Sequence, residues 1–300
     1  MKKQRKTKKK NSPILSVVVV SYNTKGLLSD CLNSLRKVKK EVEFETIVVD
    51  NASGDGSPEM VNKDYPWAKL IELEKNIGFS KGNNAARKYV KGEYVLFLNS
   101  DTIVQANALK KSVEYLRTHK DVGSMTCKIV LPDGSLDKDV RRSFPTPWVA
   151  LTHLVFRLDR VFPKSKLFAQ YWYGYKSENE IHEVDVIQGA FHLTRKEILD
   201  DVGWFDEDYF LDGEDIDLCW QIKKAGWKIM YYPRVKITHI KKASKKSKDK
   251  SQRRRFIMAG VEAMELFYKK RMKGTYPSFV NALVTLGIRF TKFIRLLRVT

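Results

Sequence analysis

The chain contains 300 residues, 43% of them hydrophobic and 30% charged, and its formal net charge is +21. This composition supplies enough apolar residues for a core and excludes a wholly disordered chain. The excess charge lies at the ends, because residues 1–10 carry +7, residues 241–300 carry +14, and residues 11–240 are neutral. The total charge suggests a nucleic-acid-binding protein, but the neutral body lacks a basic-aromatic stacking motif, so no nucleic-acid partner is expected.

The three cysteines, Cys31, Cys127 and Cys219, are isolated and form no CxxC pair. Neither a disulfide framework nor a zinc site is therefore expected, and a reducing compartment is favoured. The N-terminal lysines are followed by Asn-Ser-Pro instead of an apolar run, which is unlike a signal peptide. No segment reaches the ~18 uncharged apolar residues of a membrane-spanning helix. These features predict a cytoplasmic location.

Strand and helix patterns alternate over the first third of the chain. Residues 14–20 form a run rich in β-branched residues, typical of a strand buried on both faces, and apolar residues recur at helical spacing over 27–35. Further strands are predicted over 44–49, 69–73 and 94–98, with a helix between the last two. This alternation predicts an α/β fold with a mostly parallel sheet and helices on both faces.

Polar residues follow these strands at their carboxyl ends, which is where ligands bind in such sheets. They are Ser21 and Asn23, Asp50, Asn76, and Asn99 with Asp101. A carboxylate such as Asp101 suits Mg²⁺ bound to a diphosphate, because this cation takes one or two protein carboxylates together with substrate oxygens. Asp50 is equally compatible with a residue that only starts the turn after its strand.

The alternation of strands and helices is less regular in the second half of the chain. An aromatic-rich stretch extends to Tyr175, and strands are predicted over 184–193, with a break at Gln188-Gly189, and over 228–232, before His239. On its own, a histidine at a strand end is compatible with a purely structural role.

A helix with an acidic start is predicted from a cap at Asp212 to Gly226. Its first turn carries Glu214, Asp215 and Asp217. A carboxylate in that turn is stabilised as the anion by the helix dipole, which suits a general base. The same acids are equally compatible with a helix start that has no catalytic role.

Taken in order, short motifs over residues 14–245 resemble those of the family 2 glycosyltransferases, particularly their bacterial rhamnosyltransferase-like branch. Each motif is weak alone, whereas the ordered set is highly specific. The motifs are Ser21-Tyr22-Asn23, Val48-Val49-Asp50-Asn51-Ala52-Ser53, Asn76-Ile77-Gly78-Phe79, Gly82-Asn83-Asn84, Leu98-Asn99-Ser100-Asp101, Gln188-Gly189-Ala190, Gly203-Trp204-Phe205-Asp206, Glu214-Asp215-Ile216-Asp217-Leu218-Cys219 and His239.

The resemblance implies a glycosyltransferase A fold, which is α/β with a mostly parallel, Rossmann-like sheet flanked by helices. It also implies an inverting reaction, a nucleotide-diphosphate sugar donor and Mg²⁺ or Mn²⁺. The expected domains are a basic disordered arm over 1–12, a catalytic domain over 13–245, and a basic amphipathic helical extension over 246–300. Within the catalytic domain, 13–105 forms the donor-binding half and 106–245 the acceptor and catalytic half.

Residue roles are carried over from the same resemblance. Donor-binding residues are Ser21, Asn23, Asp50, Gly78, Gly82, Asn83, Asn99 and Ser100. The metal would be held by Asp101 and His239, while Asp215 would act as general base beside Glu214. Acceptor contacts are expected from Gln188, Gly189, Asp217 and Arg142.

Two positions depart from the family pattern. Asn99 stands where the family's Asp-x-Asp motif begins, and Gln221 stands where the family usually has an arginine. These departures motivate an alternative, an inactive relative that binds a nucleotide sugar at the membrane. Retention of Asp101, Asp215 and His239 weighs against it.

The C-terminal segment has the pattern of a basic amphipathic helix that lies in a membrane interface. The residues that make this pattern are Phe279, Val280, Leu283, Leu286, Phe290, Phe293, Ile294 and Leu297, with Arg289, Lys292, Arg295 and Arg298. Packing of this helix on the catalytic domain is the rival interpretation. The basic segment 241–255 is compatible with a solvated loop or with a surface that faces anionic groups. The apolar residues over 148–155 are compatible with core packing or with a second interfacial patch.

The sequence therefore predicts a peripheral enzyme on the inner face of the cell membrane, acting on a lipid-linked or cell-surface glycan acceptor. An anionic membrane surface is the expected partner of the C-terminal helix. The rhamnosyltransferase-like motifs favour a deoxythymidine-diphosphate rhamnose donor, with a uridine-diphosphate hexose as the alternative.

Overall fold

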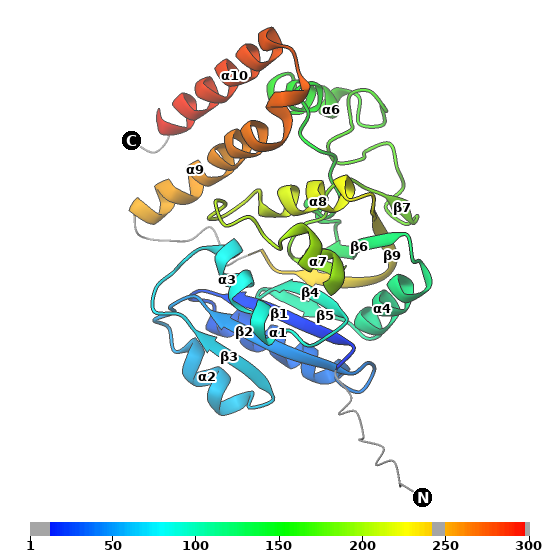
Figure 1. The fold of residues 1–300 in the computed structure, drawn as a ribbon, viewed down its shortest axis with the longest axis vertical. Helices are drawn as coiled ribbons and strands as arrows, with labels where there is room; N and C mark the ends of the chain where they lie inside the picture. Colours follow the sequence, from blue (N-terminus) through cyan, green and yellow to red (C-terminus); the bar gives the residue numbers. More distant parts are fainter. Residues whose placement is uncertain (1–12, 242–249, 298–300) are drawn as a thin grey trace, which may run out of the picture.

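The computed structural model describes residues 13–241 and 250–297 (Figure 1). The predicted basic arm over 1–12, the predicted domain boundary at 245/246 and part of the basic segment 241–255 lie outside these residues.

Four parallel strands form the first half of the sheet, as the sequence predicts. They are β1 (Leu15–Ser21), β2 (Phe44–Asp50), β3 (Ala68–Glu72) and β4 (Tyr94–Asn99), connected through α1 (Lys25–Val38), α2 (Ser57–Asp64), α3 (Phe79–Ala85) and the 3-10 turn η1 (Arg87–Tyr89). Every residue of β1 is buried, which explains its β-branched run. Its register pairs Ser21 with Asp50 and Val20 with Asn99, so the polar strand ends lie side by side.

Beyond β4 the sheet is mixed, so the predicted parallel character holds for the first half. The remaining strands are β5 (Thr102–Val104), β6 (Val122–Val130), β7 (His182–Glu183), β8 (Phe191–Arg195) and β9 (Lys228–His239). The strand β8 runs antiparallel to β4 and β6, whereas β9 is parallel to β6 and antiparallel to β5 and β7. The resulting order is β3-β2-β1-β4-β8-β6-β9-β5, with β7 paired to β9.

Two strands differ in extent from the prediction. The strand predicted over 184–193 is regular only from Phe191, because the chain before it leaves the sheet and places Gln188 and Gly189 in a cavity. Conversely, β9 continues through Pro233 to His239. A register shift against β6 leaves the proline outside the regular pairing, which suits a residue without an N–H donor.

The helix α8 (Glu214–Lys224) carries the acidic turn at its start, and it is preceded by α7 (Lys196–Val202). Its cap is Gly213, at φ 85°, and not the predicted Asp212. Glycine favours this left-handed conformation because it has no Cβ. Other short elements are α4 (Ala108–Thr118), which the sequence analysis did not identify, η2 (Lys138–Val140), α5 (Pro147–Ala150), the π-helical turn η3 (Leu151–Val155) and α6 (Leu158–Val161).

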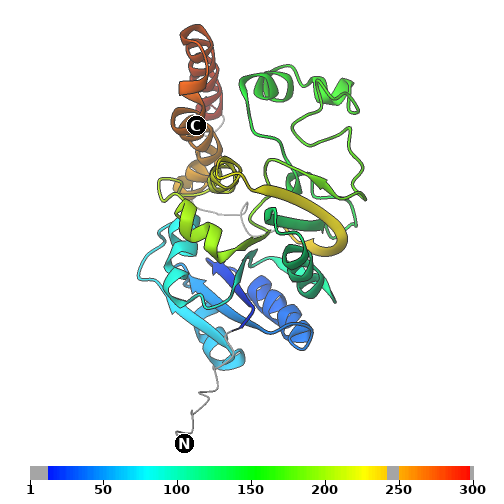
Figure 2. The same ribbon diagram turned by 45° about the vertical axis from the view of Figure 1, so that its right-hand side comes forward.

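The C-terminal extension is helical and docks on the domain. It consists of α9 (Lys250–Phe267), the π-helical turn η4 (Tyr268–Met272), the 3-10 turn η5 (Lys273–Thr275) and α10 (Ser278–Leu297). Both views show α9 between α8 and α10, at the end of the molecule opposite β3 (Figures 1 and 2). Among the described helices, none combines the length and apolarity needed to cross a bilayer.

Candidate functional site

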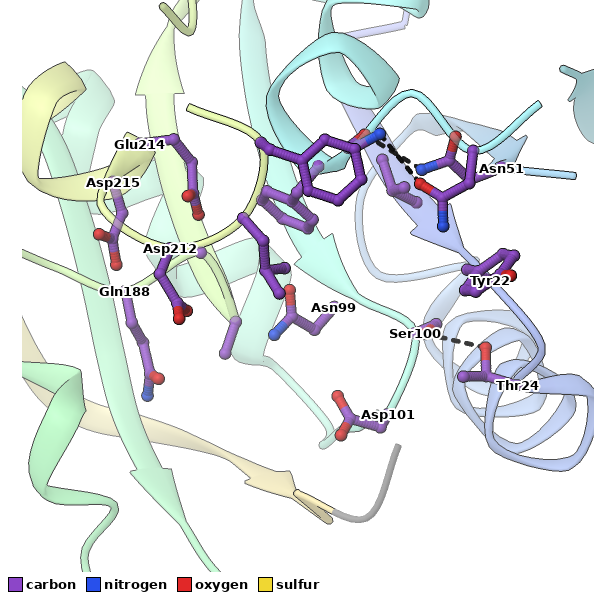
Figure 3. Close-up of a pocket in the computed structure, with 18 residues that line it drawn as sticks. Tyr22, Thr24, Asn51, Asn99, Ser100, Asp101, Gln188, Asp212, Glu214 and Asp215 are labelled. Carbon is purple, nitrogen blue, oxygen red and sulfur yellow. Dashed lines mark hydrogen bonds between the residues drawn. The ribbon is translucent and has the colours of Figure 1, made fainter. Parts of the chain in front are cut away.

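A cavity of about 370 Å³ opens at the carboxyl ends of β1, β2 and β4 (Figure 3). One wall comes from the strand ends, and the other comes from α8 and the loop before it. Predicted site residues that line the cavity are Gly78, Asn99, Ser100, Asp101, Gln188, Gly189, Glu214 and Asp215. The fold thus brings Asp101 and Asp215 to one cavity, although they lie 114 positions apart in the sequence.

One corner of the site is built around Asp101 and His239. The strands β5 and β9 pair so that Thr102 faces His239, which sets the histidine beside Asp101. The His239 Nε2 atom lies 3.2 Å from Asp101 Oδ1, and both side chains are buried. Burial disfavours the charged imidazole, but hydrogen bonds with Asp101 and Asp137 outweigh this effect and raise the pKa of His239 to about 9.

Asp137 holds the other side of His239, and the sequence analysis did not identify it. Its Oδ2 lies 2.9 Å from His239 Nδ1 and also accepts a hydrogen bond from Gln188 Nε2, while Lys241 Nζ donates to Oδ1 at 2.7 Å. Burial would raise the pKa of this carboxyl, but these three donors hold it far below its usual range. The carboxylate therefore directs Nδ1 away from the cavity and leaves Nε2 facing Asp101.

The second corner contains Asp215, whose Oδ2 accepts a hydrogen bond from Arg142 Nη2 and whose Oδ1 accepts one from the Ile216 amide at 2.7 Å. An isolated bridge to Val186 anchors the backbone of Arg142. Arg142 thus lies behind Asp215, outside the lining of the cavity, and fixes the orientation of its carboxylate.

Glu214 lies beside Asp215 in a different electrostatic state. Its side chain is buried, and within residues 13–241 and 250–297 its Oε2 atom has no hydrogen-bond partner. Burial, and then the negative charges of Asp215 and Asp212, raise the pKa of Glu214 well above its usual range. The two adjacent acids therefore differ, because one is paired with a cation and the other favours the neutral form.

The donor-side residues form an interlocked set of loops. Asp50 accepts a hydrogen bond from the Ser53 amide at 2.7 Å, and its buried Oδ2 has no partner in the described part of the chain. Asn23 accepts one from the Gly54 amide, which joins the loops after β1 and β2. At φ 90°, Gly78 approaches the neighbouring chain so closely that a Cβ there would lie 2.5 Å from the Phe210 carbonyl oxygen.

Several predicted residues lie behind the cavity wall. Ser21 bonds to Thr24, whereas Gly82 packs against Val20 and Asn83 donates to the Phe79 carbonyl. Neither these three predicted residues nor Asn23 and Asp50 are among the lining residues, so they border or support the cavity.

Asp217, predicted to contact the acceptor, points to the opposite side of α8. It is fully buried and is bonded by Tyr209, Gln221 and Arg271. Lining residues that had no predicted role in the site include Tyr22, Phe79, Phe210, Leu211 and Asp212. Four of them are apolar or aromatic side chains, and their sequence pattern does not distinguish them from core residues.

Asp101 and His239, whose side chains contact each other, could together hold a cation. Across the described residues, no three His, Cys, Asp or Glu side chains gather as a cation site. One carboxylate and one imidazole fit a divalent ion that takes its remaining ligands from water and substrate phosphates.

The sequence matches the family model described as "Glycosyltransferase like family 2" over residues 12–259. It is 27% identical over 240 residues to the N-acetylglucosaminyl-diphospho-decaprenol L-rhamnosyltransferase of Mycobacterium tuberculosis, covering 76% of each chain. Identity to the rhamnosyltransferase WbbL of Escherichia coli K12 is 28% over 232 residues, 74% of this chain and 82% of that one. A solved structure of the mannosyltransferase PcManGT from Pyrobaculum calidifontis, in complex with GDP-Man and Mn²⁺, superimposes with a TM-score of 0.59 at 19% identity, covering 96% of this chain and 74% of that one.

Proposed function

This chain belongs to glycosyltransferase family 2, and we propose that it transfers a sugar from a nucleotide-diphosphate donor to a lipid-linked or cell-surface glycan acceptor, with inversion at the anomeric carbon. The family, the enzyme class and the glycosyltransferase A fold predicted from the sequence are confirmed. The observation that carries the proposal is the meeting of Asp101 and Asp215 at one cavity.

The donor is proposed to lie along the ends of β1, β2 and β4. The Asp50 Oδ2 atom supports this placement, because it has no partner within residues 13–241 and 250–297 and a buried carboxylate oxygen needs a donor such as a ribose hydroxyl or a base N–H. The names of the relatives support a rhamnosyl donor, since two of them are rhamnosyltransferases.

Asp101 and His239 would hold Mg²⁺ or Mn²⁺, as their donor atoms, the position of Asp101 at the cavity and the contact between the two side chains suggest. The Mn²⁺ bound in the similar mannosyltransferase structure supports this assignment. When bound, such an ion neutralises the negative charge that develops on the departing nucleotide diphosphate. Asp137 would keep the His239 ring oriented towards it.

We assign the general base to Asp215. Its carboxylate takes the proton from the acceptor hydroxyl as that oxygen forms the new bond to the anomeric carbon. The bond from this carbon to the diphosphate oxygen breaks on the opposite face, and the electron pair leaves with the nucleotide diphosphate. Arg142 supports the carboxylate from behind, and the neutral form of Glu214 avoids a second negative charge beside it.

A donor panel tests the proposed function. With Mn²⁺ or Mg²⁺ present, deoxythymidine-diphosphate rhamnose, uridine-diphosphate hexoses and guanosine-diphosphate mannose are compared for thermal stabilisation and for hydrolysis or transfer. Binding at 100 times Kd stabilises a protein by about 2.7 kcal/mol, so one donor should raise the melting temperature clearly. Absence of both stabilisation and turnover with all donors would contradict the proposal.

The exposed face of α10 is proposed to bind an anionic membrane surface. Phe279, Leu283, Leu286, Phe290 and Phe293 are 58–68% exposed and recur at spacings of three and four, while Ile288 on the opposite face is buried against α9. Arg289 and Lys292 flank this stripe. The side chains of Leu297 and Arg298 lie outside the described residues. An apolar stripe with flanking cations is typical of helices that lie in an anionic interface.

A second apolar surface lies at the same end of the molecule (Figures 1 and 2). Trp148, Leu151, Leu154 and Val155 are exposed there, whereas Val149 is buried. Four of these five residues therefore fit an interfacial patch. Both surfaces would then face the membrane that carries a lipid-linked acceptor, and we propose that they bind its inner face.

Replacement of Leu283 and Phe290 by glutamate is expected to abolish sedimentation of the protein with vesicles that contain anionic phospholipid. Each substitution removes an apolar side chain that would contact the lipid and adds a negative charge that the anionic lipid repels. Thr285→Glu is the matched control, because this exposed residue lies on the same helix outside the stripe. Equal binding of all variants, or loss of self-association instead of vesicle binding, would show that the stripe has another partner.

A further inference from the structure

We infer that Arg271, in the C-terminal extension, is a positioning residue for the catalytic end of α8. This inference rests on the proposed function, since it concerns the helix that carries Asp215. Arg271 lies beyond residue 259, where the match to the family model ends. Among the described residues, the extension therefore supplies a cation to α8 from outside the family match.

The contact is made to Asp217, which lies two residues after Asp215 in the first turn of α8. Arg271 donates from Nε to Asp217 Oδ1 at 2.6 Å and from Nη2 to Oδ2 at 2.8 Å. Tyr209 and Gln221 donate to the same carboxylate at 3.2 Å and 3.1 Å. The Asp217 side chain is 0% exposed, whereas that of Arg271 is 25% exposed. A buried carboxylate requires such compensation, and a two-pronged guanidinium contact fixes its position as well as its charge.

The surrounding packing makes α8 sensitive to this contact. Phe267 packs edge-on against Trp220 of α8, with ring centroids 5.8 Å apart. At the start of the helix, a Cβ on Gly213 would lie 2.7 Å from the Ala263 Cβ of α9. The extension therefore contacts α8 at its start and along one side, and Asp217, the partner of Arg271, lies between Gly213 and Trp220 in the sequence.

Gln221 is neutral, so it cannot supply the positive charge that pairs with Asp217. It lies four residues after Asp217, on the same face of α8, and its neutral amide donates one hydrogen bond to Asp217. An arginine at this position would supply the cation from within the helix. In this chain the cation is Arg271, so the geometry of α8 depends on the docked extension.

The experiment moves the positive charge that pairs with Asp217 from position 271 in the extension to position 221 in α8. Arg271→Gln is expected to lower kcat of sugar transfer by roughly tenfold to a hundredfold, because small displacements of a catalytic group cost that much, without a matching rise in KM for the donor. Amide hydrogen exchange over residues 214–219 is expected to quicken. Adding Gln221→Arg to this variant should restore both kcat and slow exchange, because the new guanidinium reaches Asp217 along the helix.

Lys270→Gln is the matched control. Lys270 precedes Arg271 and binds Asp206 and Asp208 at 2.6 Å, and in the described part of the chain it makes no hydrogen bond to α8. Its loss should change kcat by no more than about twofold, because the contact of Arg271 with Asp217 is kept.

The double variant decides between positioning and simple anchoring of the extension. If Arg271 only anchors the extension, Gln221→Arg will restore neither kcat nor exchange, and the inference is overturned. If Arg271→Gln alone does not fold, a folded and active double variant supports the inference, and an unfolded or inactive one overturns it. Failure of the wild type to use any donor would instead contradict the proposed function, while hydrogen exchange would still test the role of Arg271.

Discussion

Replacement of Asp215 by asparagine is expected to lower kcat of sugar transfer by roughly 10²- to 10⁴-fold, the usual contribution of a general base. Asparagine keeps the size of the side chain and can still face Arg142, but it cannot accept the proton of the acceptor hydroxyl. Donor affinity should change little, because donor binding is assigned to the strand ends on the other wall of the cavity. Steady-state transfer kinetics and donor titration measure the two effects separately.

Glu214→Gln is the informative comparison for this prediction. Burial and the neighbouring acids raise the pKa of Glu214, so its neutral form resembles glutamine, and its replacement should cost much less activity than Asp215→Asn. The opposite ranking would reassign the base to Glu214. Undiminished kcat in Asp215→Asn would remove the proposed proton transfer altogether.

The first half of the fold could be predicted from the sequence because its signal is local. In β1, all residues of a run rich in valine are buried, and the polar residues that follow each strand mark the edge where the cavity opens. Asp101 was identified in this way, whereas Asp215 was identified from the acidic first turn of a predicted helix and from the family resemblance. The mixed pairing of β8 and β9 was not predicted, because strand direction is set by long connections that leave no local pattern.

The residues that support the two acids escaped prediction for the same reason. Asp137 follows a turn and is adjacent to no motif, yet its contacts reach His239 and Gln188, which are 102 and 51 positions away. Arg271 lies in a run of basic residues that is typical of a solvated surface, yet it binds a buried acid. Sequence patterns indicate which residues can perform chemistry, whereas the residues that hold them are identified only by the fold.

Replacement of Asp101 by asparagine is expected to lower affinity for Mn²⁺ at least about 100-fold, since even partners behind a metal ligand contribute 10- to 100-fold. The charge of this carboxylate, and not its shape, is what a hard cation requires. Transfer activity should fall with occupancy of the metal, and a chelator should abolish activity in the wild type. Electron paramagnetic resonance of Mn²⁺, with and without a nucleoside diphosphate, measures binding independently of turnover.

Asp137→Asn tests the proposed metal site at Asp101 and His239 with a smaller expected effect. Asp137 is assigned to orient His239 and not to touch the cation, so its replacement should weaken Mn²⁺ by roughly 10- to 100-fold, less than the loss of Asp101. Asp139→Asn is the matched control, because Asp139 shares Lys241 with Asp137 but makes no hydrogen bond to His239 in the described structure. Unchanged Mn²⁺ affinity in Asp101→Asn would place the cation elsewhere. A loss in Asp139→Asn equal to that in Asp137→Asn would mean that negative charge near Lys241, and not the orientation of His239, governs the site.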